Sequence, residues 1–274
     1  MDRKEPINEI LEKISPKTDF RDESHMNKLL NGVAGFMPAT DFTDNAMLIS
    51  NLGYLFAKNG YNTCILDLKV FYPNLYSYLD VAPNKKGRGL MAILKSDKID
   101  IRTEINVTKY ENLYLLSPSP QDAIEEYFDF EISDVTTLIT VLHKIFDVVL
   151  IDIPNNPPLE FCVGAVEKCN IGFFTASERL DAINKITRFL DYSAALGIGT
   201  AKFANAVFMN VQDCGFDYDI IKRMKIQITA QLPLIKAAIT NSFEGMLYIK
   251  DNALVNQYFH DQLENIARAI VNLG

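Results

Sequence analysis

Two aspartates and one polar loop are the residues of this chain whose positions could support phosphate chemistry. Asp67 stands near the end of an apolar run at 62–68, and Asp152 closes a second run at 147–152. The loop at 40–47 has the sequence TDFTDNAM; it follows a buried-strand pattern at 32–36 and opens a helical pattern at 45–58. A strand, a loop and a helix in this order form the setting of phosphate-binding loops, which use glycines, a lysine and a Ser or Thr. The setting is present here, whereas the motif is absent.

Short apolar runs alternate with segments of helical periodicity along most of the chain. We predict strands at 32–36, 62–68, 112–116, 147–152, 171–174, 204–210 and 226–230, and helices at 45–58, from near 90, at 132–145, 178–195 and 251–273. Apolar strands separated by helices favour a mostly parallel sheet covered on both faces. The expected fold is a three-layer α/β/α sandwich with its ligand site at the carboxyl ends of the strands. We predict one α/β domain at 31–274 behind an N-terminal arm at 1–30.

Composition and charge narrow the classes of function. The 274 residues are 48% hydrophobic and carry a formal net charge of −8. Binding to nucleic acid depends on clustered Lys and Arg, so no nucleic-acid partner is expected. The local basic cluster at 85–88 is interpreted as a solvated loop, with a partner or anionic-lipid contact as the alternative. No signal peptide or apolar run of membrane length is apparent, which predicts a cytoplasmic protein without direct membrane insertion.

The cysteines and histidines form no recognisable metal or redox motif. The four cysteines, Cys64, Cys162, Cys169 and Cys214, contain no C-x-x-C pair, and the three histidines are isolated. Cys162 and Cys169 are seven residues apart and would share one face of a helix. Zinc ligands lie closer together in sequence, so core packing is the favoured interpretation and no metal site is predicted.

Several segments resemble the ParA/MinD family of deviant Walker ATPases, which has a P-loop NTPase-like fold. The run DVVLIDIP at 147–154 resembles the Walker B segment, and 45–68 resembles the first helix and second strand of the family. Asn210, after Phe208 and Met209, is similar to the Asn that contacts adenine, and Pro233 lies in a segment similar to the nucleotide-facing loop. The resemblance covers about residues 32–273. It implies ATP and Mg²⁺ as ligands and a homodimer as the assembly.

The family's phosphate-loop pattern, K-G-G-V-G-K-T-T, is lost at every position that contacts phosphate. Counting back from Asn51, the signature lysine falls on Thr40, the glycines on Asp41, Phe42 and Asp44, the loop lysine on Asn45 and the magnesium Thr on Ala46. Glycines admit backbone N–H groups to phosphate, whereas a bulky Phe and two carboxylates block or repel it. Asn45 brings no charge and Ala46 no metal ligand. The resemblance thus implies a vestigial site, at which ATP and Mg²⁺ bind weakly or not at all.

Thr43 and Asp44 have a second interpretation, as the N-cap of the helix at 45–58. Either side chain could accept hydrogen bonds from early N–H groups and offset the helix dipole. We hypothesise that this cap has replaced the phosphate, so that the helix end needs no nucleotide. Weakened nucleotide binding without efficient hydrolysis is the alternative.

The other vestigial positions each keep two interpretations. Family members carry D-x-D after the second strand, whereas here Asp67 is followed by Lys69 in the place of the second acid. The resemblance makes Asp152 a water-mediated magnesium contact; as an ordinary strand-end residue it would cap the turn before Pro154. Asn210 either contacts adenine or makes ordinary loop hydrogen bonds. No catalytic residue is predicted.

Two further segments resemble the TadZ and CpaE proteins of Flp-type pilus assembly: KGRGLMAIL at 86–94 with DKID at 97–100, and NLYLLSP at 112–118. The resemblance implies a non-catalytic or weakly active positioning or scaffold factor of a pilus or transfer machine. Its partners would be a second copy and proteins of a membrane-associated machine, which would recruit it to the inner membrane face or cell pole. The alternative is a true partition ATPase with an atypical phosphate loop. A small-molecule enzyme is a third option, without a visible acid–base or nucleophile set.

Overall fold

The computed structural model describes residues 32–39, 43–96, 100–212, 215–250 and 257–271. The expected N-terminal arm at 1–30, the loop residues Thr40, Asp41 and Phe42, and Cys214 lie outside the described residues, as does the predicted helical segment 251–256.

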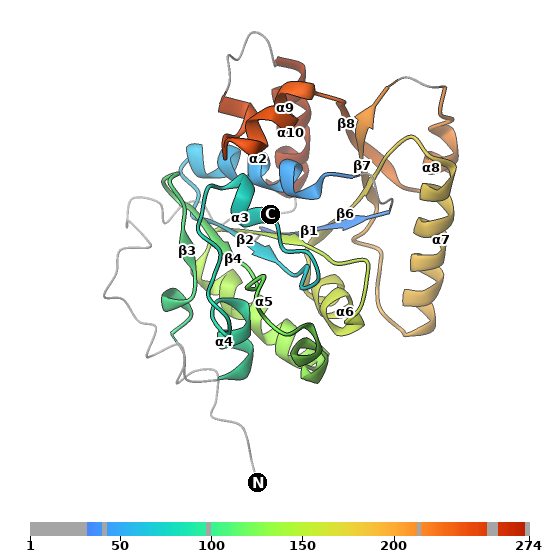
Figure 1. Ribbon diagram of the computed structural model, residues 1–274. Coiled ribbons are helices and arrows are strands. Elements are labelled where there is room, and N and C mark those ends of the chain that lie inside the picture. The colour runs from blue at the N-terminus through green and yellow to red at the C-terminus, as the bar shows by residue number, and fades with distance from the viewer. Residues whose placement is uncertain (1–31, 40–42, 97–99, 213–214, 251–256, 272–274) are drawn as a thin grey trace.

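One eight-stranded sheet forms the middle of the described structure (Figure 1). Its strands are β1 (Gly32–Pro38), β2 (Thr63–Asp67), β3 (Asn106–Val107), β4 (Leu113–Leu116), β5 (Val148–Asp152), β6 (Ile171–Ala176), β7 (Asn205–Val211) and β8 (Gln227–Pro233). The order across the sheet is β3-β4-β2-β5-β1-β6-β7-β8, and all neighbours are parallel except β3 and β4. The predicted three-layer α/β/α fold with a mostly parallel sheet is confirmed.

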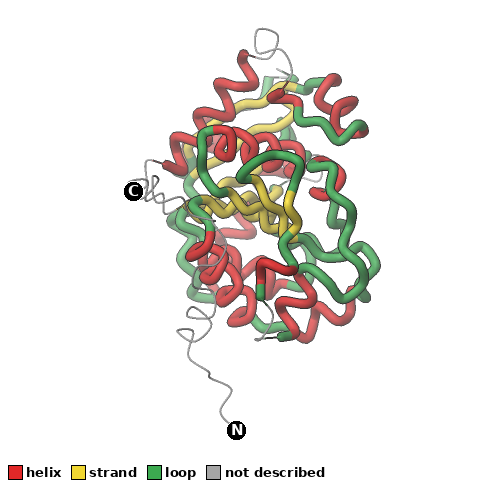
Figure 2. The backbone as a smooth tube through the Cα atoms, turned by 90° about the vertical axis from the view of Figure 1, so that its left-hand side faces the viewer, coloured by secondary structure: helices red, strands yellow, loops and turns green. Residues whose placement is uncertain are grey.

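Helices cover both faces of this sheet, as Figures 1 and 2 show. One face carries α2 (Asn45–Lys58), α3 (Leu75–Tyr78), α9 (Lys236–Phe243) and α10 (Gln257–Val271). The other carries α4 (Leu90–Lys95), α5 (Ile132–Ile145), α6 (Leu159–Lys168), α7 (Leu180–Ala195) and α8 (Asp219–Arg223). Short 3₁₀ helices occupy Ile101–Thr103, Ile124–Asp129 and Tyr248–Lys250.

The central strand β1 is buried along its whole length, because helices lie on both of its faces. Its side chains alternate between two hydrophobic clusters: Ala34 and Phe36 pack with α2 and α10, whereas Val33 and Met37 pack with α5, α6 and α7. This alternation follows from the two-residue period of a strand. Gly35 allows a close approach, since a Cβ there would lie 2.4 Å from the Cys169 Sγ.

Some elements differ from those predicted. Strand β8 extends from Gln227 to Pro233 rather than 226–230. Strand β3 and helices α3, α6 and α8 were not predicted. The α6 pattern is weak because small residues supply its packing face: a Cβ on Gly164 would lie 2.8 Å from the Cβ of Val135 on α5.

Two side-chain predictions are tested by burial. Cys162 and Cys169 are buried in the cluster formed with α5 and α6, which confirms core packing. The side chains of the basic cluster at 85–88 are exposed, as expected of a solvated loop, and Arg88 also makes an ion pair. The Arg88 Nη2 lies 2.6 Å from Oε1 of Glu104, whose side chain is 2% exposed. A buried carboxylate needs such a partner, so the loop is held against the sheet edge by charge.

Candidate functional site

The two predicted aspartates lie side by side. Asp67 ends β2 and Asp152 ends β5, and the two residues are register partners in the parallel pair. Both are fully buried. A sheet edge with two adjacent buried carboxylates is a strongly acidic position, and the free energy of their burial requires nearby donors or cations.

Asn45, the first residue of α2, joins this carboxylate pair to two other strands. Its Nδ2 donates to Asp152 Oδ1 at 3.2 Å and to the Phe36 carbonyl at 3.3 Å. Its Oδ1 accepts a hydrogen bond from Thr175 Oγ1 at 2.5 Å. The Asn45 side chain is therefore hydrogen-bonded within the protein, between β1, β5 and β6.

Asp44 caps the N-terminus of α2. Its Oδ1 accepts from the Met47 N–H at 3.0 Å, and its Oδ2 accepts from the Tyr78 hydroxyl at 2.7 Å. Burial, followed by the charge of Asp44, raises the pKa of Tyr78 well above its usual range, which keeps that hydroxyl a donor. The capping interpretation is confirmed for Asp44, and the carboxylate offsets the positive end of the helix dipole.

Lys69 supplies the cation of the site. Its Nζ lies 2.9 Å from Asp152 Oδ1, and its side chain is 22% exposed. Its backbone N–H also donates to Asp67 Oδ1 at 3.0 Å. The turn-capping interpretation of Asp152 is wrong: the described contacts of its carboxylate are with Lys69 and Asn45, not with the turn before Pro154. One lysine thus holds both aspartates.

Burial sets the protonation of the pair. It is the largest cause that raises the pKa of Asp67 to about 7, and the neighbouring Asp152 charge adds to it. Burial also raises the pKa of Asp152, while Lys69 and then Asn45 oppose the rise. Within the described residues, Asp152 Oδ2 has no hydrogen-bond partner. Asp152 is therefore the partner stabilised as a charge, and Asp67 is the one that keeps a proton near neutral pH.

The described donor set does not fit a magnesium nucleotide. A metal ion at Asp152 would face the Lys69 ammonium, which already lies 2.9 Å from Oδ1. The side chain of the buried Ala46 has no oxygen to offer, and Asp44 places a carboxylate at the helix N-terminus where phosphate would bind. No cluster of three or more His, Cys, Asp or Glu side chains with metal-site geometry occurs in the part of the chain that the structure describes.

The remaining predicted residues lie apart from this network. Asn210 has a positive φ of 56° in β7, and Pro233 ends β8 next to it, paired with Val211. Strand β7 is three strands from β5, on the order of 14 Å away at the usual strand spacing. Thr43 is half-buried beside the cap. The roles of Thr175 and Tyr78 were not predicted; the only sequence signal was a polar Thr175 at the end of an apolar run.

Comparison with solved structures places this architecture. MinD from Pyrococcus horikoshii OT3, complexed with Mg-ADP, matches with a TM-score of 0.72 and 15% identity over 89% of this chain and 98% of that one. The MinC:MinD complex of Aquifex aeolicus matches with a TM-score of 0.72 and 14% identity, covering 87% of this chain and 96% of that one. A ParA family ATPase from Chlorobium tepidum TLS gives 0.70 and 17%, covering 85% and 96%.

These likenesses define the class of fold: an α/β sandwich of the P-loop NTPase type. More particularly, the arrangement of strands and helices is that of MinD and ParA-family ATPases. No protein-family model matches the sequence, and no curated protein matches it significantly. Within the described residues, no helix has both the length and the apolar character that a membrane span needs.

Removal of the Lys69 charge should destabilise the fold. In Lys69→Met, Asp152 stays buried without its cation, which should lower the free energy of unfolding by about 3 kcal/mol. Urea denaturation measures this. Lys222→Met on α8 is the matched control, since its ion pair with Asp219 is exposed and should contribute less than about 0.5 kcal/mol. The double variant K69M/D152N should recover most of the loss. Equal effects of K69M and K222M would contradict the role of Lys69.

Asp67 should make folding stability fall as pH rises. An unfolded Asp titrates near 3.9, whereas the folded pKa is about 7. Between these values the folded protein binds a proton that the unfolded chain has released. The stabilisation is therefore complete below about pH 4 and lost above about pH 7, at up to about 1.4 kcal/mol per pH unit.

Asp67→Asn keeps one oxygen that can accept from the Lys69 N–H, and it cannot ionise. Urea denaturation at pH 5 and pH 8 should show a smaller loss of stability for D67N than for the wild type. The exposed Asp129→Asn serves as control and should follow the wild type. A D67N protein that loses stability as steeply as the wild type would rule out Asp67 as the titrating group.

Proposed function

We propose that this chain is a ParA/MinD-like protein in which an internal polar network has replaced the nucleotide, and that it acts as a non-catalytic positioning or scaffold factor. The observation that carries the proposal is the contact of the Lys69 ammonium with Asp152 Oδ1 at 2.9 Å. An acidic residue that binds Mg²⁺ through water needs an open side towards the metal. Here the chain's own cation already holds one oxygen of that carboxylate.

The N-terminus of α2 supports the same conclusion. In a phosphate-binding loop, the N–H groups and dipole of the following helix attract the anion. In this chain the Asp44 carboxylate accepts from the Met47 N–H and is fixed by Tyr78. A phosphate would have to displace this carboxylate or lie next to it, and two like charges at 4 Å repel by about 4 kcal/mol at an effective dielectric of 20. Nucleotide binding is therefore disfavoured on the anion side and on the metal side.

A protein that does not hydrolyse ATP can still act in a positioning system by binding its partners. The solved Aquifex aeolicus complex shows MinD with a protein partner, MinC. For this chain we propose protein partners in a pilus or transfer machine, by the resemblance of 86–94 and 112–118 to TadZ and CpaE. We place it in the cytoplasm, recruited by these partners to the inner membrane face or the cell pole.

ATP should leave the thermal stability of the protein unchanged. A ligand at 100 times its Kd adds about 2.7 kcal/mol of stability, which raises Tm by several degrees in a domain of this size. Millimolar ATP or ADP with Mg²⁺ should instead change Tm by less than about one degree in differential scanning calorimetry. A rise of several degrees would overturn the proposal and favour the weak-nucleotide alternative.

The rival function, a partition ATPase with an atypical phosphate loop, predicts a different pair of results. It requires steady phosphate release above background and DNA retention that weakens with salt. The acidic chain and the Lys69 contact argue against both. A D152N variant provides the control for phosphate release, because contaminating activity would persist in it.

Any homodimer should form without ATP, because the family's cross-subunit lysine is replaced by Thr40. Light scattering at tens of micromolar protein should give the dimer mass with and without ATP and Mg²⁺. A monomer mass in the nucleotide-free sample would reject the proposed dimer, and a mass that doubles only with ATP would reject nucleotide independence.

A further inference from the structure

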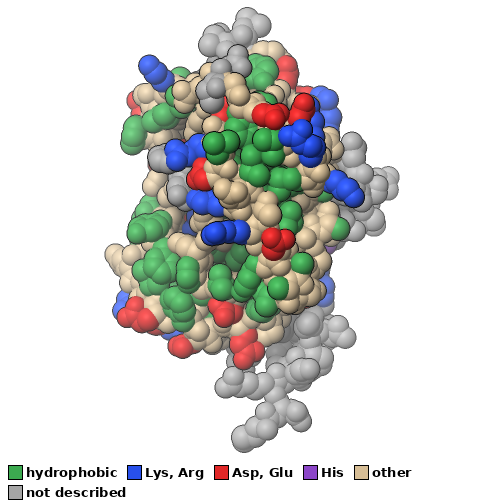
Figure 3. All heavy atoms as spheres, turned by 90° about the vertical axis from the view of Figure 1, so that its right-hand side faces the viewer, with side chains coloured by type: hydrophobic (Ala, Val, Ile, Leu, Met, Phe, Trp, Pro, Cys, Tyr) green, Lys and Arg blue, Asp and Glu red, His purple; other side chains and the backbone are tan. Residues whose placement is uncertain are grey.

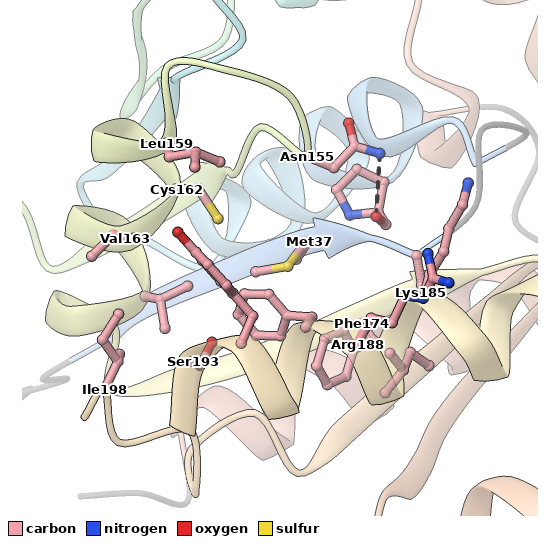
Figure 4. A pocket seen from close by; sticks show the side chains of 16 residues that line it. Met37, Asn155, Leu159, Cys162, Val163, Phe174, Lys185, Arg188, Ser193 and Ile198 are labelled. Atoms are coloured by element: carbon pink, nitrogen blue, oxygen red, sulfur yellow. Dashed lines mark hydrogen bonds between the residues drawn. The ribbon is translucent and has the colours of Figure 1, made fainter. Parts of the chain in front are cut away.

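A cavity of about 340 Å³ opens between α6 and α7, on the face of the sheet opposite α2 (Figure 4). This volume falls at the lower end of the range of about 300–1,000 Å³ for small-molecule sites. Its floor consists of the last residues of β1 and of Phe174 on β6. The cavity thus shares strand ends with the Asp152 network but lies outside it.

The walls of the cavity are apolar. Val163 on α6 and Ile186 and Phe189 on α7 face each other across it, above Met37. Leu159 at the rim is 47% exposed, so apolar surface continues to the outside. Such a wall favours a ligand with a hydrocarbon chain or ring over a sugar or a nucleotide base.

Two cations lie at one end of this apolar space. Lys185 and Arg188 come from α7 and belong to the cavity lining, whose described residues include no Asp or Glu (Figure 4). Lys185 Nζ lies 3.8 Å from Asp181 Oδ2. Within the described residues, Arg188 has no acidic partner at ion-pair distance. Among the described residues, positive charge thus gathers at this end of the cavity, although the chain carries a net charge of −8.

Figure 3 views the side of the molecule on which α7 and α8 lie. Hydrophobic side chains gather there in patches, with Lys and Arg side chains between them. An amphiphilic ligand could therefore reach the cavity from solvent with its apolar part directed inward and its charged part left at the Lys185 and Arg188 end.

We propose that this cavity binds a small amphiphile with one anionic head group, of the class of medium-chain carboxylic acids. The apolar walls take the hydrocarbon chain, and Lys185 and Arg188 take the carboxylate. Arginine suits this role because its planar guanidinium can bind both oxygens of a carboxylate. The proposal is independent of the nucleotide site and goes beyond the proposed function.

A ligand in the cavity would contact the ends of β1 and β6, which also hold the hydrogen bonds of Asn45. Asn155 Nδ2 donates to the Pro38 carbonyl at 3.4 Å, as Figure 4 shows. The next residue, Ala39, donates its N–H to the Thr175 carbonyl at 2.7 Å, and Thr175 Oγ1 donates to Asn45. A bound chain would lie against Pro38 and Phe174, so ligand binding should stabilise the region that positions Asn45.

The test measures binding of a series of free carboxylates, from hexanoate to dodecanoate, by titration calorimetry below their micelle concentrations. Affinity should rise about threefold to fourfold with each methylene, as expected for burial of a CH₂ group, and level off once the cavity is full. Decanol, the neutral counterpart of decanoate, should bind at least tenfold more weakly. The chain contains no tryptophan, so Leu159→Trp at the rim adds a single fluorescent reporter that should respond to the same ligands.

Two variants separate the cavity from general surface binding. Lys185→Gln with Arg188→Gln should weaken decanoate at least tenfold, whereas the exposed pair Lys222→Gln with Arg223→Gln on α8 should leave its affinity unchanged. Val163→Phe should fill the cavity and abolish binding while circular dichroism confirms the fold. No saturable binding by the wild type, equal affinity for decanol, or equal loss in both charge variants would overturn the proposal.

Discussion

A buried carboxylate at the end of β5 is the constraint on which the rest of this site depends. Asp152 is fully buried, and the free-energy cost of an unpaired ion in that position would be prohibitive. Lys69 contributes the charge and Asn45 contributes a hydrogen bond. Because these residues come from the turn after β2 and from the start of α2, one carboxylate fixes the relative positions of three elements at the carboxyl edge of the sheet.

Helix α2 is likewise held by side-chain hydrogen bonds within the protein. Asp44 closes its N-terminus, and further along the helix Asn51 accepts the Ile249 N–H at 2.8 Å on its Oδ1. Asn51 also donates to the Met47 carbonyl at 2.7 Å, so its amide is used in both directions. Asp44 thus satisfies the Met47 N–H at the helix start from within the protein. An N–H group that a carboxylate already holds is less available to an external anion.

Local patterns predicted the fold well and the site only in part. The helices 45–58 and 132–145 were predicted at their observed bounds, since each has an apolar stripe of full length and a clear start. The Asp44 cap was also predictable, because it joins residues three apart. The hydrogen bonds of Asn45 with Asp152 and Thr175 join residues that are 107 and 130 positions apart. The periodicity of the sequence cannot predict such long-range contacts. The sequence places Lys69 just after β2. Its contact with Asp152 depends on β2 and β5 being neighbours in the sheet, which the sequence pattern does not show.

Structural likeness to MinD and ParA-family ATPases does not by itself imply that this chain depends on nucleotide. Because β5 and β1 are neighbours in the sheet, Asp152 at the end of β5 lies next to the start of α2. What fills the space between them is decided by side chains. In this chain an ammonium, an amide and a hydroxyl occupy positions beside Asp152 and Asn45. The end of β5 and the start of α2 are thus held together by the chain's own side chains.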